Sequence, residues 1–250
     1  MEGEGHMSAR KGVIVLLVLV LAVMTGCRTL NVDSGKSSGL ALDRGCEVKS
    51  KSVDVVNPVA MAGGPVKPDG ELGEAAWKKA VAMTGFIAGA DQPKVRTRVL
   101  VTCDKQNLYV AVVSEEPKTG DIIAKGTDEN PDQVWRDDCV EVYVDPRNEK
   151  QGTRGYYGFF VNPNGAAYDR TRNGAWDGEW TRGARVLKGT GWTAELAIPF
   201  KTMGIEAKKG HKLGLMVARS RKPDGGGYYT LVPCGNEAKD TTKYPVLELK

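Results

Sequence analysis

The feature that most constrains this chain is an alternation of apolar and polar residues, with a period of two, that recurs from Pro65 onward. One such run spans 95–102, and a second run at 108–113 follows the turn 104–107. Because successive side chains of a strand point to opposite faces of a sheet, this pattern predicts a β-hairpin. A third run, 139–145, has valines at alternate positions and predicts a strand that ends at Asp145-Pro146.

Further strands are predicted over 156–161, 166–170, 181–188, 192–198, 213–220, 228–232 and 245–249. Helical signals are confined to residues 73–80 and to the short segment after Pro199. The 31 glycines and 12 prolines supply the turns that a chain of short strands needs. The sequence therefore predicts an all-β fold, an antiparallel β-sandwich of two sheets (jelly-roll or immunoglobulin-like) with one or two short helices, and Trp77 and Trp192 in its core.

The N-terminus has the pattern of an export signal. Arg10-Lys11 precede eleven consecutive apolar residues, 13–23, which as a helix reach only ~17 Å, short of a ~30 Å hydrocarbon core. The run ends in Met24-Thr25-Gly26-Cys27, which resembles a bacterial lipobox with lipidation at Cys27. We expect a lipid anchor in the cell envelope, on the periplasmic face or the outer surface of a bacterial membrane; an ordinary signal peptide or a short anchor is the alternative.

These features divide the chain into three parts. Residues 1–26 are predicted to be the lipoprotein signal peptide, and residues 27–62 a flexible tether, because the segment 34–39 is rich in Ser, Gly and Lys. The segment 51–58 has a few valines and is a candidate edge strand. Residues 63–250 form the predicted β-sandwich.

Export would place the other cysteines in an oxidising compartment. Cys46, Cys103, Cys139 and Cys234 allow three disulfide connectivities, or they are free buried thiols, and their spacing fits no zinc site. The net charge is +4, and no basic block is longer than a dipeptide, so a nucleic-acid partner is not expected.

Five segments in order resemble the landmarks of family 9 carbohydrate-binding modules and their relatives, over about residues 65–250. They are 69–77 (DGELGEAAW), 107–110 (NLYV), 135–145 (WRDDCVEVYVD), 160–165 (FVNPNG) and 191–199 (GWTAELAIP). The resemblance implies a β-sandwich that binds sugars, often at a chain end, in a groove on one sheet.

The resemblance also implies site residues. Trp135 would be a flat wall on which a sugar ring stacks, with core or loop packing as the alternative. Glu141 would accept hydrogen bonds from sugar hydroxyls, and its position between Val140 and Val142 turns it away from the core. An ion pair of Glu141 with Arg96 or Arg98 on a neighbouring strand is the alternative.

Two departures from the family pattern affect this site. No second tryptophan occurs in 232–244 to complete a clamp, so Tyr228 or Trp176 is a candidate replacement. The family arginine is replaced near Phe160, on the strand that ends at Asn162, and Asn162 completes the candidate set. Tyr229, Tyr244 and Trp180 are further candidate replacements for the tryptophan.

Acidic residues around the third run suggest two other chemistries. Asp138 and Asp145 are candidate calcium ligands, since calcium prefers carboxylate oxygens, and no other cofactor is expected. Glycoside hydrolysis needs two carboxyl groups about 5–10 Å apart. Asp137 and Glu141 share a strand face but are ~13 Å apart, so we expect no catalysis.

The function expected from these observations is carbohydrate binding, of a mono- or oligosaccharide, by a lipid-anchored envelope β-sandwich that assists glycan capture or breakdown. The alternatives are an envelope module that binds another protein and an accessory domain of a glycoside hydrolase system.

Overall fold

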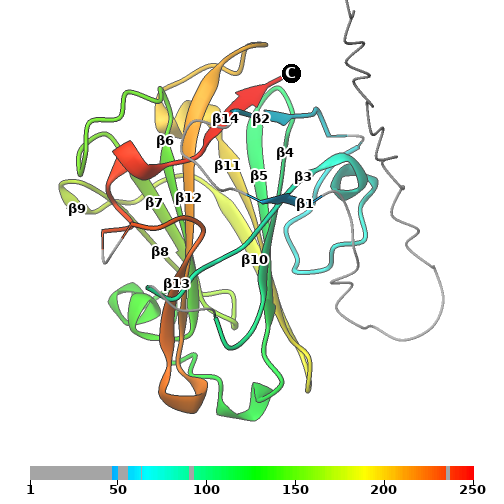
Figure 1. Cartoon of the computed structure of the whole chain (residues 1–250), viewed down its shortest axis with the longest axis vertical. Coiled ribbons are helices and arrows are strands. Elements are labelled where there is room, and N and C mark those ends of the chain that lie inside the picture. The colour runs from blue at the N-terminus through cyan, green and yellow to red at the C-terminus, as the bar shows by residue number, and fades with distance from the viewer. Residues whose placement is uncertain (1–46, 50–55, 63, 90–92, 235–236) are drawn as a thin grey trace, which may run out of the picture.

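The alternating runs form two β-sheets that pack face to face. Figure 1 shows one layer with β6, β7, β8 and β12 and a second layer with β4, β5 and β10. The structure, a computed structural model, describes residues 47–49, 56–62, 64–89, 93–234 and 237–250. Cys27, Cys46 and the predicted signal peptide lie outside the described residues.

The first sheet has the strand order β1-β3-β4-β5-β11-β10 and is antiparallel except for the pair β1 and β3. Its strands are β1 (Glu47–Lys49), β3 (Val81–Thr84), β4 (Thr97–Cys103), β5 (Asn107–Glu115), β10 (Thr181–Leu187) and β11 (Gly191–Pro199).

The second sheet has the order β2-β14-β12-β6-β7-β8-β9, with β13 also paired to β12, and is antiparallel except for β2 and β14. Its strands are β2 (Val56–Val59), β6 (Cys139–Asp145), β7 (Tyr157–Val161), β8 (Ala167–Thr171), β9 (Gly174–Ala175), β12 (Lys212–Arg221), β13 (Gly227–Thr230) and β14 (Val246–Leu249). The predicted antiparallel β-sandwich is confirmed.

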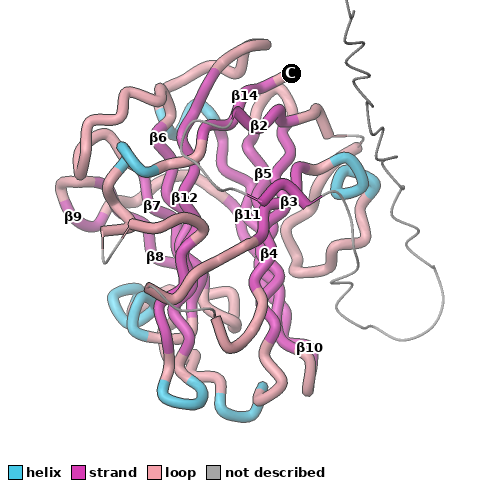
Figure 2. Tube along the Cα trace, viewed as in Figure 1, coloured by secondary structure: helices cyan, strands magenta, loops and turns pink. Residues whose placement is uncertain are grey.

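Helical structure in the described residues is limited to short 3₁₀ turns in the connections between strands (Figure 2). The turns η1 and η4 occupy the two predicted helical segments, whereas η3 was not anticipated. The turns are η1 (Ala75–Lys79), η2 (Thr119–Asp121), η3 (Pro131–Arg136), η4 (Phe200–Met203), η5 (Pro223–Gly225) and η6 (Thr241–Lys243). No helix in the described ranges has the length and apolar character to span a membrane.

The sheets extend N-terminal to residue 63, where the sequence placed the start of the sandwich. β2 overlaps the candidate edge strand at 51–58 and pairs in parallel with β14, with Val56 opposite Val246. β1 likewise pairs with β3. An uncovered sheet edge leaves backbone groups unpaired, and these two short strands cover one edge of each sheet.

The space between the sheets is filled by the apolar face of each alternating run. Val140, Val142 and Val144 of β6 are fully buried there, together with Trp192 of β11. Trp77 is also buried, but it packs on the outer face of the first sheet in a second, smaller cluster with Leu100, Tyr109, Ala111, Ala197 and Ala82. The prediction that both tryptophans are core residues is therefore confirmed, in two different cores.

The cysteines in the described residues are thiols rather than disulfides. Cys103 and Cys139 are buried, and Cys234 is half-buried. Burial, with a smaller contribution from the nearby charge of Asp104, raises the pKa of Cys103 to about 11. Of the two alternatives left open by the sequence, these three residues follow the thiol one.

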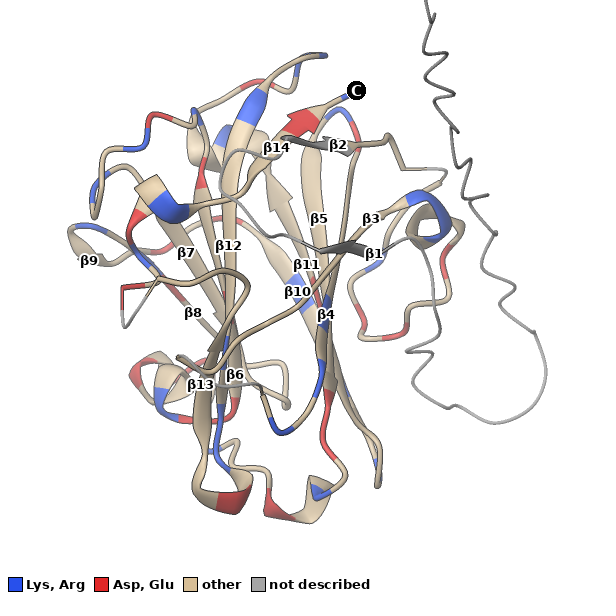
Figure 3. Cartoon of the chain, in the orientation of Figure 1, with Lys and Arg blue, Asp and Glu red and all other residues tan. Residues whose placement is uncertain are grey.

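Charged residues are interspersed over the surface: Figure 3 shows Lys and Arg positions mixed with Asp and Glu positions on the loops and strand ends. One group of charges is instead buried between the sheets. Glu116, just after β5, is fully enclosed and accepts hydrogen bonds from the Nε (2.6 Å) and Nη2 (3.0 Å) of Arg221 on β12. The guanidinium of Arg219 lies 3.6 Å from the same carboxylate and donates to the Glu115 carbonyl at 2.9 Å. This network, the inter-sheet clamp, joins β5 of one sheet to β12 of the other.

We predict that Glu116→Gln destabilises the fold by about 3–5 kcal/mol, because it leaves the buried Arg219 guanidinium without its ion-pair partner and Arg221 with only the longer contact to Asp224 at 3.4 Å. Urea unfolding of both proteins measures the difference. Glu179→Gln is the matched control, since Glu179 forms an exposed ion pair with Lys201 and its loss changes stability little. An equal effect of the two substitutions would contradict a role for the clamp in holding the sheets together.

Candidate functional site

Three of the five predicted sugar-binding residues meet in one pocket on the outer face of the second sheet. Trp135, Glu141 and Tyr228 line this cavity of about 160 Å³. We call it the Trp135 pocket. Its other lining residues are Tyr143, Phe160, Tyr168, Arg170, Ala238 and Lys239.

The alternation of β6 places Glu141 in this pocket. Val140 and Val142 face the core, and Glu141 faces the opposite side, as predicted. In the antiparallel register Glu141 stands opposite Phe160 of β7, which stands opposite Tyr168 of β8. The neighbours of β6 are β7 and β12, whereas Arg98 lies on β4 of the other sheet and Arg96 pairs with Glu115. The alternative of an ion pair between Glu141 and Arg96 or Arg98 is therefore not formed.

Trp135 lies on η3, immediately before β6, and its side chain is 45% exposed. Pro131 begins this turn, and buried Val134 anchors it. The Arg136 guanidinium carbon lies 4.8 Å from the centroid of the Trp135 ring. Trp135 is therefore an accessible flat surface at the pocket rim rather than a core residue.

The C-terminal segment contributes the wall formed by Ala238 and Lys239. Thr241 holds this segment in place, because its backbone N–H and its Oγ1 both donate to the Gly152 carbonyl at 2.9 Å. The pocket thus requires residues separated by about a hundred positions in the chain.

The Glu141 carboxylate is only 6% exposed and is held by two tyrosines. The hydroxyls of Tyr143 (2.7 Å) and Tyr228 (2.8 Å) both donate to its Oε2. Burial raises the pKa of Glu141 above its ordinary value, and the two hydroxyls, followed by the positive charges of Lys239 and Lys222, lower it in part. The site therefore has a preorganised acceptor beside an aromatic wall.

Asn162 does not line the pocket. It is fully buried, and its Nδ2 donates to the Gly126 carbonyl and to Asp137 Oδ2, each at 3.0 Å. Its Oδ1 accepts from the backbone N–H of Asn164 and of Ala166. The structure therefore places Asn162 in the support of a turn.

Trp176 also lies apart from the pocket. Its ring contacts Tyr157 and Phe159 edge-on, with centroids 5.2 and 6.2 Å away. Because residues alternate along β7, Phe159 faces the core side and Phe160 faces the pocket side. Of the five candidate replacements for the family tryptophan, only Tyr228 lines the pocket, whereas Tyr229 and Tyr244 are buried and Trp180 lines a different pocket.

The two aspartates proposed as calcium ligands lie at opposite ends of β6. They are seven positions apart, which is ~23 Å along a strand, whereas ligands of one calcium ion lie within 2.6 Å of it. Asp138 accepts from the backbone N–H of Ile123 and Lys222, and Asp145 from that of Lys150. These two residues therefore cannot hold one ion together.

A different acidic group, Asp69, Glu74 and Glu195, has oxygens within 4.8 Å of one another. Glu195 accepts from the backbone N–H of Gly70 at 2.7 Å and of Asp69 at 3.1 Å, and from Trp77 Nε1 at 2.9 Å. Burial, followed by the charge of Glu74, raises its pKa to about 7. These bonds fix the 69–77 loop onto β11, which gives the first and last sequence landmarks a structural role.

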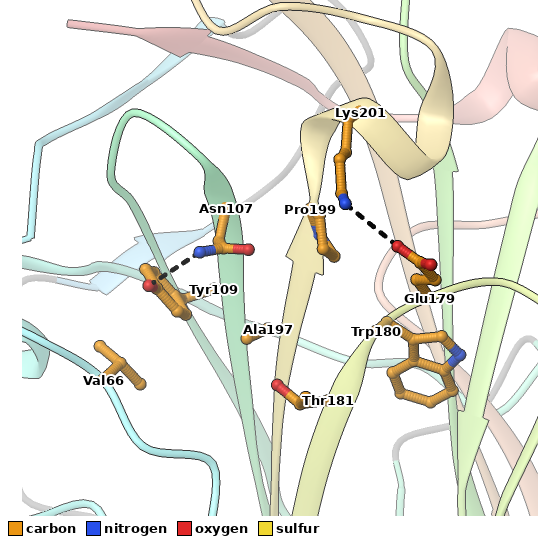
Figure 4. A pocket seen from close by; sticks show the side chains of 9 residues that line it. All are labelled: Val66, Asn107, Tyr109, Glu179, Trp180, Thr181, Ala197, Pro199 and Lys201. Carbon is orange, nitrogen blue, oxygen red and sulfur yellow. Dashed lines mark hydrogen bonds and ion pairs between the residues drawn. The ribbon is translucent and has the colours of Figure 1, made fainter.

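A larger pocket, of about 390 Å³, lies on the outer face of the first sheet (Figure 4). Most of the polar side chains that line it are already engaged with the protein. Lys201 pairs with Glu179 at 3.1 Å, the Asn107 amide donates to the Tyr109 hydroxyl, and Trp180 Nε1 donates to Asp169 at 2.7 Å. The Trp135 pocket is therefore the better candidate site.

The sequence did not indicate Arg170, Lys239, Tyr143 or Tyr168 as site residues. Tyr143 has a usable signal, since it stands two positions after Glu141 on the same strand face. Arg170 and Lys239 have none, because their positions depend on the register of β8 and on the path of the C-terminal segment.

The two packed sheets, with a small pocket on the outer face of one of them, place this protein among the β-sandwich domains. It belongs to the family described as carbohydrate family 9 binding domain-like, whose model matches residues 68–250. The predicted resemblance is thus confirmed over nearly the range expected.

Solved structures share the fold at low identity. A family 9 carbohydrate-binding module from Caldicellulosiruptor kristjanssonii in complex with cellotriose is 16% identical, with a TM-score of 0.60 over 78% of this chain and 94% of that one. The same organism's module in complex with glucose is 14% identical, with a TM-score of 0.57 over 78% and 96%. A putative carbohydrate-binding protein from Bacteroides uniformis is 16% identical, with a TM-score of 0.61 over 78% and 99%. A comparison with curated proteins gives no match.

We predict that the pKa of Glu141 lies above the ordinary pKa of a glutamate, and that Tyr143→Phe and Tyr228→Phe each raise it further, since each removed hydroxyl stabilises the ionised form. Carbon-13 NMR of the labelled carboxyl measures this. The pKa of Glu141 is higher in the folded than in the unfolded state. Its ionisation therefore lowers the free energy of unfolding as the pH rises through the interval between these two pKa values. A midpoint unmoved by both substitutions would show that the tyrosines do not set the charge of Glu141.

Proposed function

We propose that this protein binds carbohydrate in the Trp135 pocket, without catalysis, as a lipid-anchored module of the bacterial cell envelope that assists glycan capture or breakdown. The observation that carries the proposal is the convergence of an exposed tryptophan and a buried, tyrosine-held carboxylate on one small cavity. The family and the sugar complexes of two similar structures support it.

The chemistry of the pocket suits a sugar. A pyranose presents apolar C–H groups on its faces and hydroxyls at its rim, so it stacks on an aromatic ring while donating to a carboxylate. A cavity of 160 Å³ equals roughly five water volumes at ~30 Å³ each. That space accommodates a single ring, as at the end of a glycan chain.

The carboxylates around the pocket support binding without turnover. Glu141 is the one carboxylate among the residues that line it, whereas glycoside hydrolysis requires a pair. Asp137 and Asp138 are engaged by backbone and amide donors. Glu195 belongs to the first sheet, bound to the 69–77 loop.

The principal prediction is that Trp135→Ala abolishes retention of sugars on an affinity gel, because it removes the stacking surface, while the melting temperature changes little, since the ring is 45% exposed. Trp135→Phe, which keeps a flat ring, should retain part of the binding. With one tryptophan rather than two, we expect affinity near the millimolar range, or ~4–6 kcal/mol.

The control is Val186→Ala, which truncates another exposed apolar side chain, on β10. It should leave retention unchanged. If the wild-type protein retains no mono- or oligosaccharide, the envelope module that binds another protein becomes the better account.

The anchor makes a separate prediction. Cys27→Ser should release the protein from the membrane fraction, or block signal cleavage, because a serine cannot form the thioether to lipid. Fractionation and mass measurement of the N-terminus check this, with Cys103→Ser, at a buried thiol in the sandwich, as the control. Unchanged processing and membrane association would exclude the lipobox.

A further inference from the structure

The Trp135 pocket is lined by more positive than negative charge. Two cationic residues, Arg170 and Lys239, line the cavity with Glu141. Neither cation forms an ion pair with another residue in the described part of the chain. The lining is therefore net positive by one charge when Glu141 is ionised, and by two when it is protonated.

The side chain of Arg170 occupies space on the sheet that is open because its neighbour on β7 is a glycine. It stands opposite Gly158 of β7, which in turn stands opposite Tyr143 of β6. A Cβ on Gly158 would lie 3.2 Å from Arg170 Cγ and 3.2 Å from Tyr143 Cδ1. The glycine therefore leaves the space in which the stem of Arg170 lies beside the tyrosine.

The guanidinium of Arg170 has unused donor capacity. Its Nε is buried, yet no described residue accepts a hydrogen bond from it. A buried donor without an acceptor costs free energy, and this guanidinium beside the cavity has no acceptor among the described residues. Lys239 adds a second cation from the C-terminal segment, close enough for its charge to lower the pKa of Glu141.

We infer that the sugar bound in the Trp135 pocket carries a carboxylate, as in a uronic acid, which Arg170 and Lys239 bind while Glu141 accepts from a hydroxyl. This inference rests on the proposed function. A carboxylate matches the single excess positive charge, whereas a phosphate monoester brings about −1.5 to −2. A planar carboxylate also fits the donor geometry of a guanidinium.

The test compares sugars that differ only at C6. Full-length protein is titrated by calorimetry with D-glucose and D-glucuronate, with D-galactose and D-galacturonate, and with D-mannose and D-mannuronate, at low salt. We expect at least one uronate to bind about tenfold more tightly than its neutral partner, which is ~1.4 kcal/mol. The ratio should fall as salt is added.

Charge-removing variants locate the effect. Arg170→Gln and Lys239→Gln should each reduce the uronate preference, measured as the ratio of uronate affinity to neutral-sugar affinity, severalfold. Arg172→Gln and Lys243→Gln are matched controls, since each is exposed and close in sequence to its counterpart but outside the pocket lining. Both controls should keep the full preference, and thermal unfolding confirms that every variant folds.

The outcomes separate the inference from the proposed function. Equal binding of the acid and neutral sugars in every pair, or tighter binding of glucose 6-phosphate than of any uronate, overturns the inference and leaves the proposed function standing. Binding of no sugar of either kind overturns the proposed function itself. A preference that survives in both Arg170→Gln and Lys239→Gln overturns the assignment of these residues.

Discussion

The fold depends on one buried carboxylate that joins the two sheets. Glu116 directly follows β5, and its carboxylate lies against the guanidinium groups of Arg221 and Arg219 from β12. An apolar interface tolerates small sliding of one sheet over the other, but a bidentate pair has one geometry and a large penalty for leaving it. Because β12 pairs directly with β6, the clamp also fixes the strand that bears Glu141.

Asp137 and Asp138 of the landmark 135–145 act mainly by holding Trp135 in place. Asp137 Oδ2 accepts from the Gly126 N–H at 2.7 Å and from Asn162, and Asp138 accepts from the Ile123 N–H at 2.8 Å. These bonds join residues 123–126, which precede η3, to residues 137 and 138, which follow it. Asp137 and Asp138, which suggested metal or acid–base chemistry in the sequence, thus support the loop that presents Trp135. Buried carboxylates suit this role when they are hydrogen-bonded.

Much of the fold and part of the site could be predicted from the sequence, for a physical reason that differs between residues. Glu141 was predictable because alternation along one strand is a local property, and the hairpin of β4 and β5 was predictable on the same ground. Arg170 and Lys239 were not, since they reach the pocket through strand register and through a long segment without periodicity. Trp176 was misleading because an aromatic residue near a strand edge packs equally well on either face.

The arrangement of the first strands has a mechanical consequence. From its N-terminal side, the chain first adds β1 to the edge of one sheet, beside β3, and then adds β2 to the edge of the other, beside β14. A pull on that side loads these edge ladders in shear, with several hydrogen bonds stretched at once instead of one after another. The load enters at β3 and β14, whereas the pocket is built on β6, β7 and β8. Opening of β1 or β2 under such a load leaves the pairing of β6 with β7 and of β7 with β8, and with it the lining of the pocket, in place.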